Sequence, residues 1–153
     1  MKAIPIRTLA TALTLGAAAA VAWADGDLVR FPENYAEGTH YATVERGNIR
    51  EELFTSQKAI DAARSGQPLP SGTVITMEDY RGGKLFRYVV MEKRVGWGTQ
   101  YPPEVRNGEW EFQAFNADRM VNRNENVTRC MACHKSREGQ DFVFTLDRMK
   151  VSN

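Results

Sequence analysis

The sequence has few cysteines, an even balance of charge and no long hydrophobic run outside its first 24 residues. Two cysteines in 153 residues exclude the disulfide framework of a small secreted scaffold. With 20 Lys and Arg against 19 Asp and Glu, the chain offers no basic surface to a nucleic acid. It also lacks internal repeats and low-complexity tracts. A composition of 42% hydrophobic and 25% charged residues is instead typical of one globular domain.

The first 24 residues have the pattern of a secretory signal peptide. Lys2 and Arg7 precede an apolar run over residues 8–21. Residues 22–24, Ala-Trp-Ala, have the small-x-small form of a signal-peptidase site. The run is short for a membrane anchor, which needs about 20 apolar residues. We therefore predict export to the periplasm, cleavage after Ala24 and no membrane attachment of the mature chain.

The remaining chain predicts an α+β fold, mainly an antiparallel β-sheet with a few short helices. Residues 25–34 carry Gly and Pro without sustained periodicity and predict an extended lead-in to a domain over 35–153. Runs rich in β-branched and aromatic residues predict strands, and helix formers behind a Ser56 N-cap predict a helix. The predicted strands are 39–45, 73–77, 85–92 and 109–115, with a hairpin turn at 81–84 and a strand-like or extended run at 141–145. The predicted helices are 56–64 and a short one from about residue 128.

Both cysteines belong to one compact motif, Cys130-Met131-Ala132-Cys133-His134. This spacing lets two thiols add to the two vinyl groups of one haem while His134 ligates the iron as proximal ligand. A thioredoxin-like dithiol would lie near the N-terminus, at the start of a helix that follows a strand. A structural zinc site would need a fourth ligand, for which only His40 or a carboxylate remains. We predict one covalent haem c, with the dithiol or disulfide and the zinc site as alternatives.

The motif also has a distinctive setting, because it follows a strand-rich chain rather than the helices of most small haem c proteins. Five segments carry a resemblance to a known family: Tyr35–Val44 with its central His40, Pro70–Val74, Trp110–Phe112, Cys130–Lys135 and Asp141–Thr145. Over roughly residues 34–146 the sequence resembles the cytochrome P-460 family, which includes the cytochromes c′-beta. The resemblance implies a homodimer of mainly antiparallel sheet with one five-coordinate haem c per subunit. It also implies a distal pocket that binds small nitrogen species.

Two positions bear on the activity that the resemblance implies. In the P-460 enzymes, a Lys shortly after the Gly-Thr-Val segment bonds to the haem edge, and this crosslink accompanies hydroxylamine oxidation. Here residues 72–76 are followed by Met77, which favours a c′-beta-like protein over a hydroxylamine oxidase. Lys84, seven residues further on, is the alternative crosslinking residue. Arg50 falls where some members carry a distal-pocket Arg, so Arg50 and Met77 are the candidate distal residues.

Other polar and sulfur-containing side chains have structural explanations beside functional ones. We expect His40 to be packed or hydrogen-bonded, with ligation of the iron as the alternative. We expect Glu92 and Glu125 at the surface, with a proton relay as the alternative. Core packing is the expectation for the methionines Met77, Met91, Met120 and Met149, with distal ligation of the iron, which would raise the haem potential, as the alternative.

Three functions remain open at this point. The first is a haem protein that binds nitric oxide or a related ligand. The second is an enzyme that oxidises hydroxylamine or acts as a weak peroxidase. The third is a six-coordinate electron shuttle with a redox partner protein.

Overall fold

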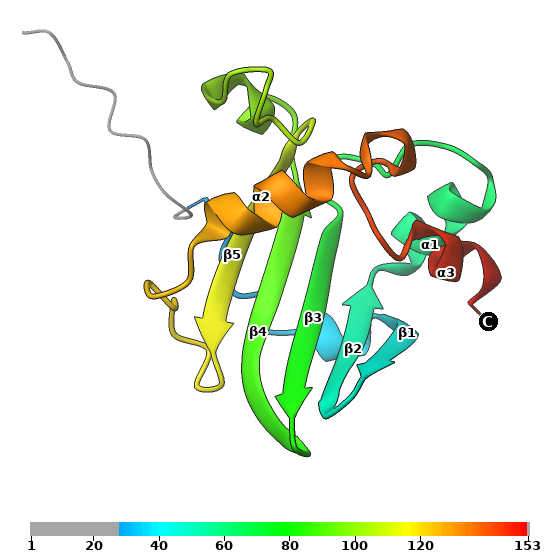
Figure 1. The fold of residues 1–153 in the computed structure, drawn as a ribbon. Helices are drawn as coiled ribbons and strands as arrows, with labels where there is room; N and C mark the ends of the chain where they lie inside the picture. The colour runs from blue at the N-terminus through cyan, green and yellow to red at the C-terminus, as the bar shows by residue number, and fades with distance from the viewer. Residues whose placement is uncertain (1–27, 153) are drawn as a thin grey trace, which may run out of the picture.

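One five-stranded antiparallel sheet forms the centre of the molecule in the computed structural model (Figure 1). The structure describes residues 28–152, so the predicted signal peptide lies outside the described residues. The strands are β1 Thr39–Arg46, β2 Ile49–Thr55, β3 Val74–Arg81, β4 Lys84–Lys93 and β5 Trp110–Asn116. The helices are α1 Gln57–Arg64, α2 Val127–Lys135 and α3 Leu146–Val151, with 3-10 turns η1 Tyr35–Glu37, η2 Trp97–Gln100 and η3 Glu138–Gln140. The predicted α+β class is confirmed.

The strands follow one another in the sheet in sequence order. Tight turns join β1 to β2 and β3 to β4, whereas residues 56–73, with α1, connect β2 to β3. Gly82 and Gly83 connect β3 to β4 with φ of 55° and 79°, the left-handed conformation of a two-residue hairpin turn. This turn lies where the sequence predicts it. Gly47, at φ 60°, opens the corresponding turn between β1 and β2.

The sequence does not predict strand β2. Its centre, residues 50–52, is Arg-Glu-Glu, a composition that is uncommon in strands. Pairing with β1 supplies partners for these charges, because Glu51 pairs with Arg46 and Glu52 with His40 across the hairpin. The Gly-Asn pair at residues 47–48 was the available signal.

Helix α1 forms as the sequence predicts. The Ser56 hydroxyl accepts a hydrogen bond from the backbone N–H of Ala59 at 3.3 Å, which caps the first turn. Ala59, Ile60 and Ala63 are buried on one side of the helix. Helices α1 and α3 lie side by side at the β1 end of the sheet (Figure 1). No helix within residues 28–152 combines the length and hydropathy needed to cross a bilayer.

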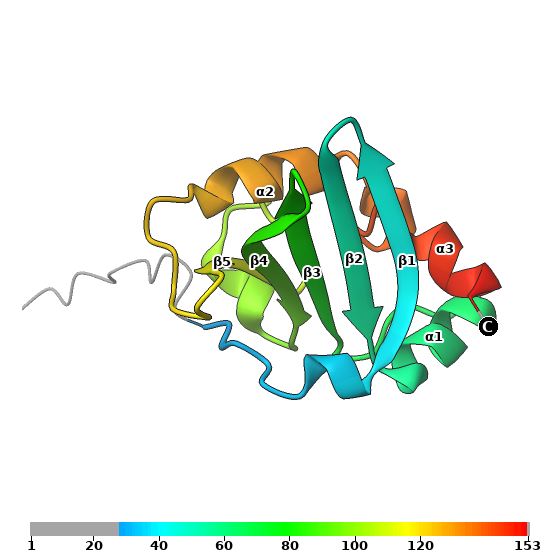
Figure 2. The ribbon, with the colours of Figure 1, turned by 90° about the horizontal axis from the view of Figure 1, so that it is seen from below.

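The two faces of the sheet are covered by different segments (Figure 2). Helix α2 crosses the motif face, whose buried residues include Ile75, Met91 and Phe112. Residues 28–38 run along the other side, the N-terminal face, where Phe31 and Tyr35 pack against Tyr88 and Phe115. Away from the β-bulges at residues 40–42 and 79–80, alternation along each strand therefore assigns the side chains of the sheet to one of these faces.

The predicted strand-like run at 141–145 is wrong. Asp141 and Phe142 have φ of 51° and 60°, which is incompatible with a strand. Phe142 and Val143 are buried, so the apolar run fills the core from a turn rather than from a strand. Helix α3, which the sequence analysis does not predict, begins immediately afterwards at Leu146.

Candidate haem site

Helix α2 presents both thiols of the Cys-x-x-Cys-His motif on one side. The Asn126 side chain caps the helix by accepting from the backbone N–H of Thr128 at 3.0 Å. Met131 points into the core, and its carbonyl accepts a 3.0 Å hydrogen bond from the buried side chain of Asn107. Cys130 and Cys133 are three residues apart and therefore neighbours on the helix surface. Both are free thiols, the first half-buried and the second exposed.

His134 is held in one orientation by its backbone and aromatic neighbours. Its Nδ1 donates a hydrogen bond to the carbonyl oxygen of Phe142 at 2.6 Å. Its ring makes edge contacts with Phe112 and Phe144, at centroid distances of 4.8 and 5.1 Å. Burial lowers the pKa of His134, although the hydrogen bond to Phe142 opposes that effect. A neutral imidazole with its Nδ1 proton engaged leaves Nε2 available for a metal.

A charged cluster lies on the motif face near Cys130. Asp79 is almost completely buried and pairs with Arg87 at 2.9 Å. Arg87 in turn pairs with Glu125 at 2.5 Å, which joins β4 to the loop before α2. Burial raises the pKa of the Cys130 thiol, while the positive charge of Arg87 lowers it. Glu125 is thus an ion-pair partner of Arg87 beside the motif.

Met77 lies on the motif face, where a side chain that contacts the haem has to lie. It is paired in register with Leu53 on β2 and Val89 on β4, and it packs against the same hydrophobic cluster as Cys130. Lys84 is at the far end of the β3–β4 hairpin, paired with Arg81. Four residues separate Met77 from Arg81 along β3, about 13 Å of strand. The register therefore does not bring Lys84 beside Met77.

Arg50 lies on the N-terminal face, so the structure does not bring it to the motif. It alternates with Glu52, to which it is paired at 3.0 Å, and stacks over the Tyr80 ring at 4.6 Å. Phe54, two residues beyond Glu52, contacts Tyr35 of η1 and therefore lies on the N-terminal face. Because alternate residues of a strand share a face, Glu52 and Arg50 lie on that face too. Arg50 and the motif of the same subunit therefore lie on opposite faces of the sheet, and its distal role stays a prediction. A shift of one residue along a strand moves a side chain to the other face of the sheet, and a sequence alignment does not show on which face a residue lies.

Two other candidates share this face. His40 is hydrogen-bonded to Glu52 at 2.7 Å, as expected, but it is exposed rather than in the core. The surface position predicted for Glu92 is wrong, because this side chain is buried and paired with Arg94 at 2.5 Å. Its position in β4, two residues from Val90, places it on the N-terminal face. Neither side chain therefore faces the motif.

The remaining methionines separate into core and surface residues. Met91 and Met149 are buried, as expected. Met120 is instead 67% exposed and lies in the turn after β5.

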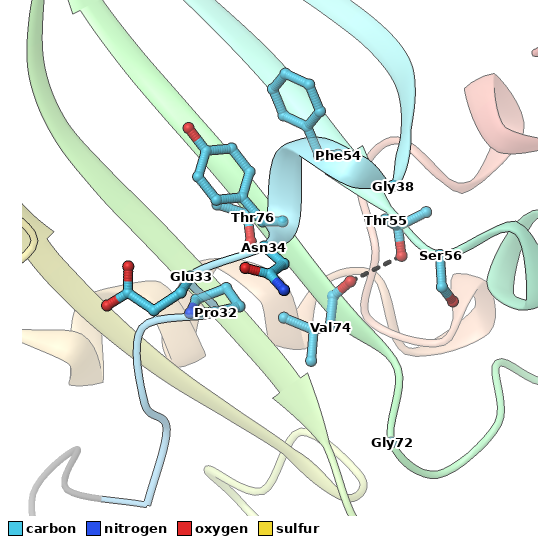
Figure 3. A pocket seen from close by; sticks show the side chains of 11 residues that line it. Pro32, Glu33, Asn34, Gly38, Phe54, Thr55, Ser56, Gly72, Val74 and Thr76 are labelled. Carbon is cyan, nitrogen blue, oxygen red and sulfur yellow. Dashed lines mark hydrogen bonds between the residues drawn. The ribbon is translucent and has the colours of Figure 1, made fainter.

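A cavity of about 460 Å³ opens on the N-terminal face (Figure 3). Its walls come from residues 32–35, the end of β2 and the start of β3. Thr55 and Val74 line it and are joined by a 2.8 Å hydrogen bond from the Thr55 hydroxyl to the Val74 carbonyl (Figure 3). No residue of the Cys-His motif lines this cavity, so it is separate from the candidate site.

The residues at the motif fit a c-type haem better than the alternatives. Two free thiols stand one helical turn apart, and the adjacent histidine donates through Nδ1, which leaves Nε2 available. Two aromatic side chains in contact with that imidazole provide apolar surroundings of the kind that a porphyrin needs. Among the described residues, no three His, Cys, Asp or Glu side chains are grouped to hold a metal ion, so the zinc alternative has no support.

Sequence reasoning misses three residues that shape this site: Asp79, Arg87 and Asp141. Asp79 and Arg87 meet only through the β3–β4 register, for which the hairpin turn was the available signal. Asp141 accepts hydrogen bonds from distant parts of the chain, and nothing local in the sequence indicates those partners.

The family model described as Cytochrome P460 matches residues 32–145 of this chain. The matched region includes the whole sheet, helix α2 and the turn that holds His134. A comparison with curated proteins gives no match. Because the family model covers most of the chain, the protein belongs to the cytochrome P460 family, for which haem is the cofactor.

Proposed function

We propose that this chain is an exported, periplasmic c-type cytochrome whose one haem is attached covalently to Cys130 and Cys133. His134 is the proximal ligand, and the distal side is open to small nitrogen ligands such as nitric oxide. The observation that carries the proposal is the 2.6 Å hydrogen bond from His134 Nδ1 to the Phe142 carbonyl, which leaves Nε2 as the free nitrogen. A haem in this position supplies a redox-active iron and a coordination site for a diatomic ligand.

The positions of the other candidate iron ligands support an open distal side. The chain has two histidines, and the second, His40, lies on the opposite face of the sheet. Met91 and Met149 are buried in the core. An incoming ligand therefore competes with few side chains of the same chain. We propose a homodimer as the working unit, as the family resemblance implies.

Met77 supports a second candidate function, the six-coordinate electron shuttle. It is the methionine that lies partly buried on the motif face beside the cluster containing Cys130. A thioether ligand would raise the reduction potential of the haem and close the distal site. The shuttle would then exchange electrons with a redox partner protein. The hydroxylamine oxidase gains no such support, because Met77 has no N–H to add to a porphyrin.

The first experiment asks whether the haem is covalent. Protein from a host with working cytochrome c maturation should keep its haem through acid-acetone extraction. Replacing both Cys130 and Cys133 with Ser should abolish that retention. A colourless wild-type protein, or one that releases all of its haem to acid acetone, would contradict the attachment.

The second experiment separates the two distal arrangements. The ferric protein should be high-spin and should bind nitric oxide in its ferrous form. If Met77 were the sixth ligand, the wild type would be low-spin and Met77→Leu would convert it to high-spin. That result would replace the ligand-binding proposal with the electron shuttle.

A further inference from the structure

The carboxylate of Asp141 connects three distant segments beneath the loop that follows the Cys-His motif. The Lys93 ammonium, at the end of β4, donates to both carboxylate oxygens at 2.7 and 2.8 Å. The backbone N–H of Leu69 donates at 3.0 Å, and the indole N–H of Trp110 donates at 3.3 Å. Trp110 is fully buried and Lys93 is 14% exposed, so these contacts of Asp141, called the anchor below, lie inside the molecule rather than on its surface.

The anchor acts on a segment of unusual backbone conformation. Asp141 and Phe142 are consecutive non-glycine residues with positive φ, a conformation that needs support from outside the segment. The Phe142 N–H donates to the Arg137 carbonyl at 2.8 Å, which closes the turn after η3. The Phe142 ring is buried against Gly108, where an added Cβ would come within 3.0 Å of the ring. The backbone of Phe142 is therefore fixed on both sides.

The Phe142 carbonyl oxygen is the acceptor for His134 Nδ1 at 2.6 Å. Asp141 immediately precedes this acceptor in the chain, and the segment between Lys135 and Asp141 is short. The network therefore runs from Lys93 and Trp110 through Asp141 to the peptide of Phe142 and then to the imidazole. Its members come from β4, β5 and the C-terminal turn.

We propose that Asp141 is a positioning residue for the proximal ligand: with Lys93 and Trp110, it fixes the carbonyl that orients His134 and sets the strength of its Nδ1 hydrogen bond. The inference rests on the proposed haem attachment and goes beyond it. A strong Nδ1 hydrogen bond makes the imidazole a better electron donor and so favours ferric over ferrous iron. Loosening the anchor should weaken that donation.

The test is the Asp141→Asn variant of the haem-loaded, full-length protein. The amide keeps the size of the side chain but loses the ion pair with Lys93. In the ferrous protein, the iron–histidine stretching band in resonance Raman spectra should move to lower frequency. The midpoint potential should rise. Lys93→Met should move both in the same direction, whereas Lys93→Arg, which keeps the cation, should remain close to the wild type.

Two matched controls separate positioning from stability. Asp147→Asn removes the same charge from an exposed pair with Lys150 and should leave the band unchanged. Tyr41→Phe deletes the 2.8 Å hydrogen bond to Thr145 and so loosens the docking of the same C-terminal segment without touching Asp141. It should lower the melting temperature without moving the band. Should Asp141→Asn fail to fold, the comparison of Lys93→Met with Lys93→Arg tests the same ion pair by the same two measurements.

An unchanged band and potential in both Asp141→Asn and Lys93→Met would overturn the positioning role and leave the proposed function intact. Equal band shifts in Tyr41→Phe and Asp141→Asn would also overturn it, since stability alone would then explain the effect. A wild-type protein without covalent haem would overturn the proposed function as well. The failures of the two proposals are therefore distinguishable.

Discussion

The two faces of the sheet carry similar kinds of residue in different arrangements. Each face has a hydrophobic cluster, a histidine and an arginine paired to a carboxylate. On the motif face, His134 is packed against two aromatic rings and Arg87 pairs with a buried Asp79. On the N-terminal face, His40 and Arg50 are about half exposed, at 45% and 48%.

The difference shows that burial, not residue type, separates a functional candidate from a surface group. An exposed ion pair contributes little because water competes for both charges. A buried pair restricts its surroundings, because removing one partner leaves an uncompensated charge. The following predictions test this distinction with matched variants from the two faces.

The largest difference is expected between the two histidines. His134→Ala should leave the thioethers in place but remove the proximal ligand, with a large change in the absorption spectrum and in nitric oxide binding. His40→Ala should leave the spectrum unchanged, because its side chain bonds Glu52 on the opposite face. Absorption spectra of both variants, recorded after haem attachment, provide the measurement. A wild-type spectrum for His134→Ala would argue against proximal ligation.

The two arginines should differ in their effect on stability. Arg87→Met should cost about 2–3 kcal/mol of unfolding free energy, because buried Asp79 keeps only the more distant Arg81 as a partner. Arg50→Met should cost less than about 1 kcal/mol, as is typical of exposed pairs. Urea unfolding of both variants gives the comparison. Equal losses would show that burial does not distinguish these pairs.

The two buried phenylalanines should match in stability but differ in spectrum. Phe112 and Phe115 are both 2% exposed, and each Phe→Leu change should cost about 1–2 kcal/mol. Phe112 contacts the His134 ring, whereas Phe115 contacts Phe31 on the other face. Phe112→Leu alone should therefore shift the haem spectrum. A spectral shift of the same size in Phe115→Leu would contradict the separation of the faces.

The smallest effect is expected at the haem edge, where we predict no third covalent bond. Met77 is a thioether without an N–H, and Lys84 lies at the far end of its hairpin. Peptide mapping should yield a haem peptide that contains Cys130 and Cys133 but neither Met77 nor Lys84. Hydroxylamine oxidation should be slow or absent, and Lys84→Met should change neither result. A haem peptide that includes either residue would restore the oxidase hypothesis.

Local signals in the sequence predict much of this fold. The Ser56 cap, the glycine pair at 82–83 and the strand-forming runs each depend on a few adjacent residues, and the structure confirms them. Strand β2 and the turn at 141–145 are missed because tertiary partners override their local preference. Arg46 and His40 make the acidic strand stable, and the Asp141 contacts stabilise an apolar segment in a turn.

The candidate site likewise has a part that the sequence predicts and a part that depends on tertiary structure. The Cys-His motif is a contiguous pattern, so the thiols and the adjacent imidazole can be read directly from the sequence. The faces on which Arg50 and Arg87 lie depend on strand register, and one residue of register reverses them. The orientation of His134 depends on a carbonyl eight residues away, in a turn whose geometry no local motif predicts.

The sequential order of the strands has a consequence for how the molecule assembles. Each of the four pairings joins strands that are neighbours in the chain, through two tight hairpins and two longer connections over residues 56–73 and 94–109, so the sheet forms from contacts that are local in sequence. The C-terminal segment makes the long-range contacts, from Thr145 to Tyr41 and from Asp141 to Leu69. We therefore expect the sheet to form first and the C-terminal segment to dock late, so that Cys130 and Cys133 stay accessible to the haem attachment machinery while the motif face of the sheet is already in place.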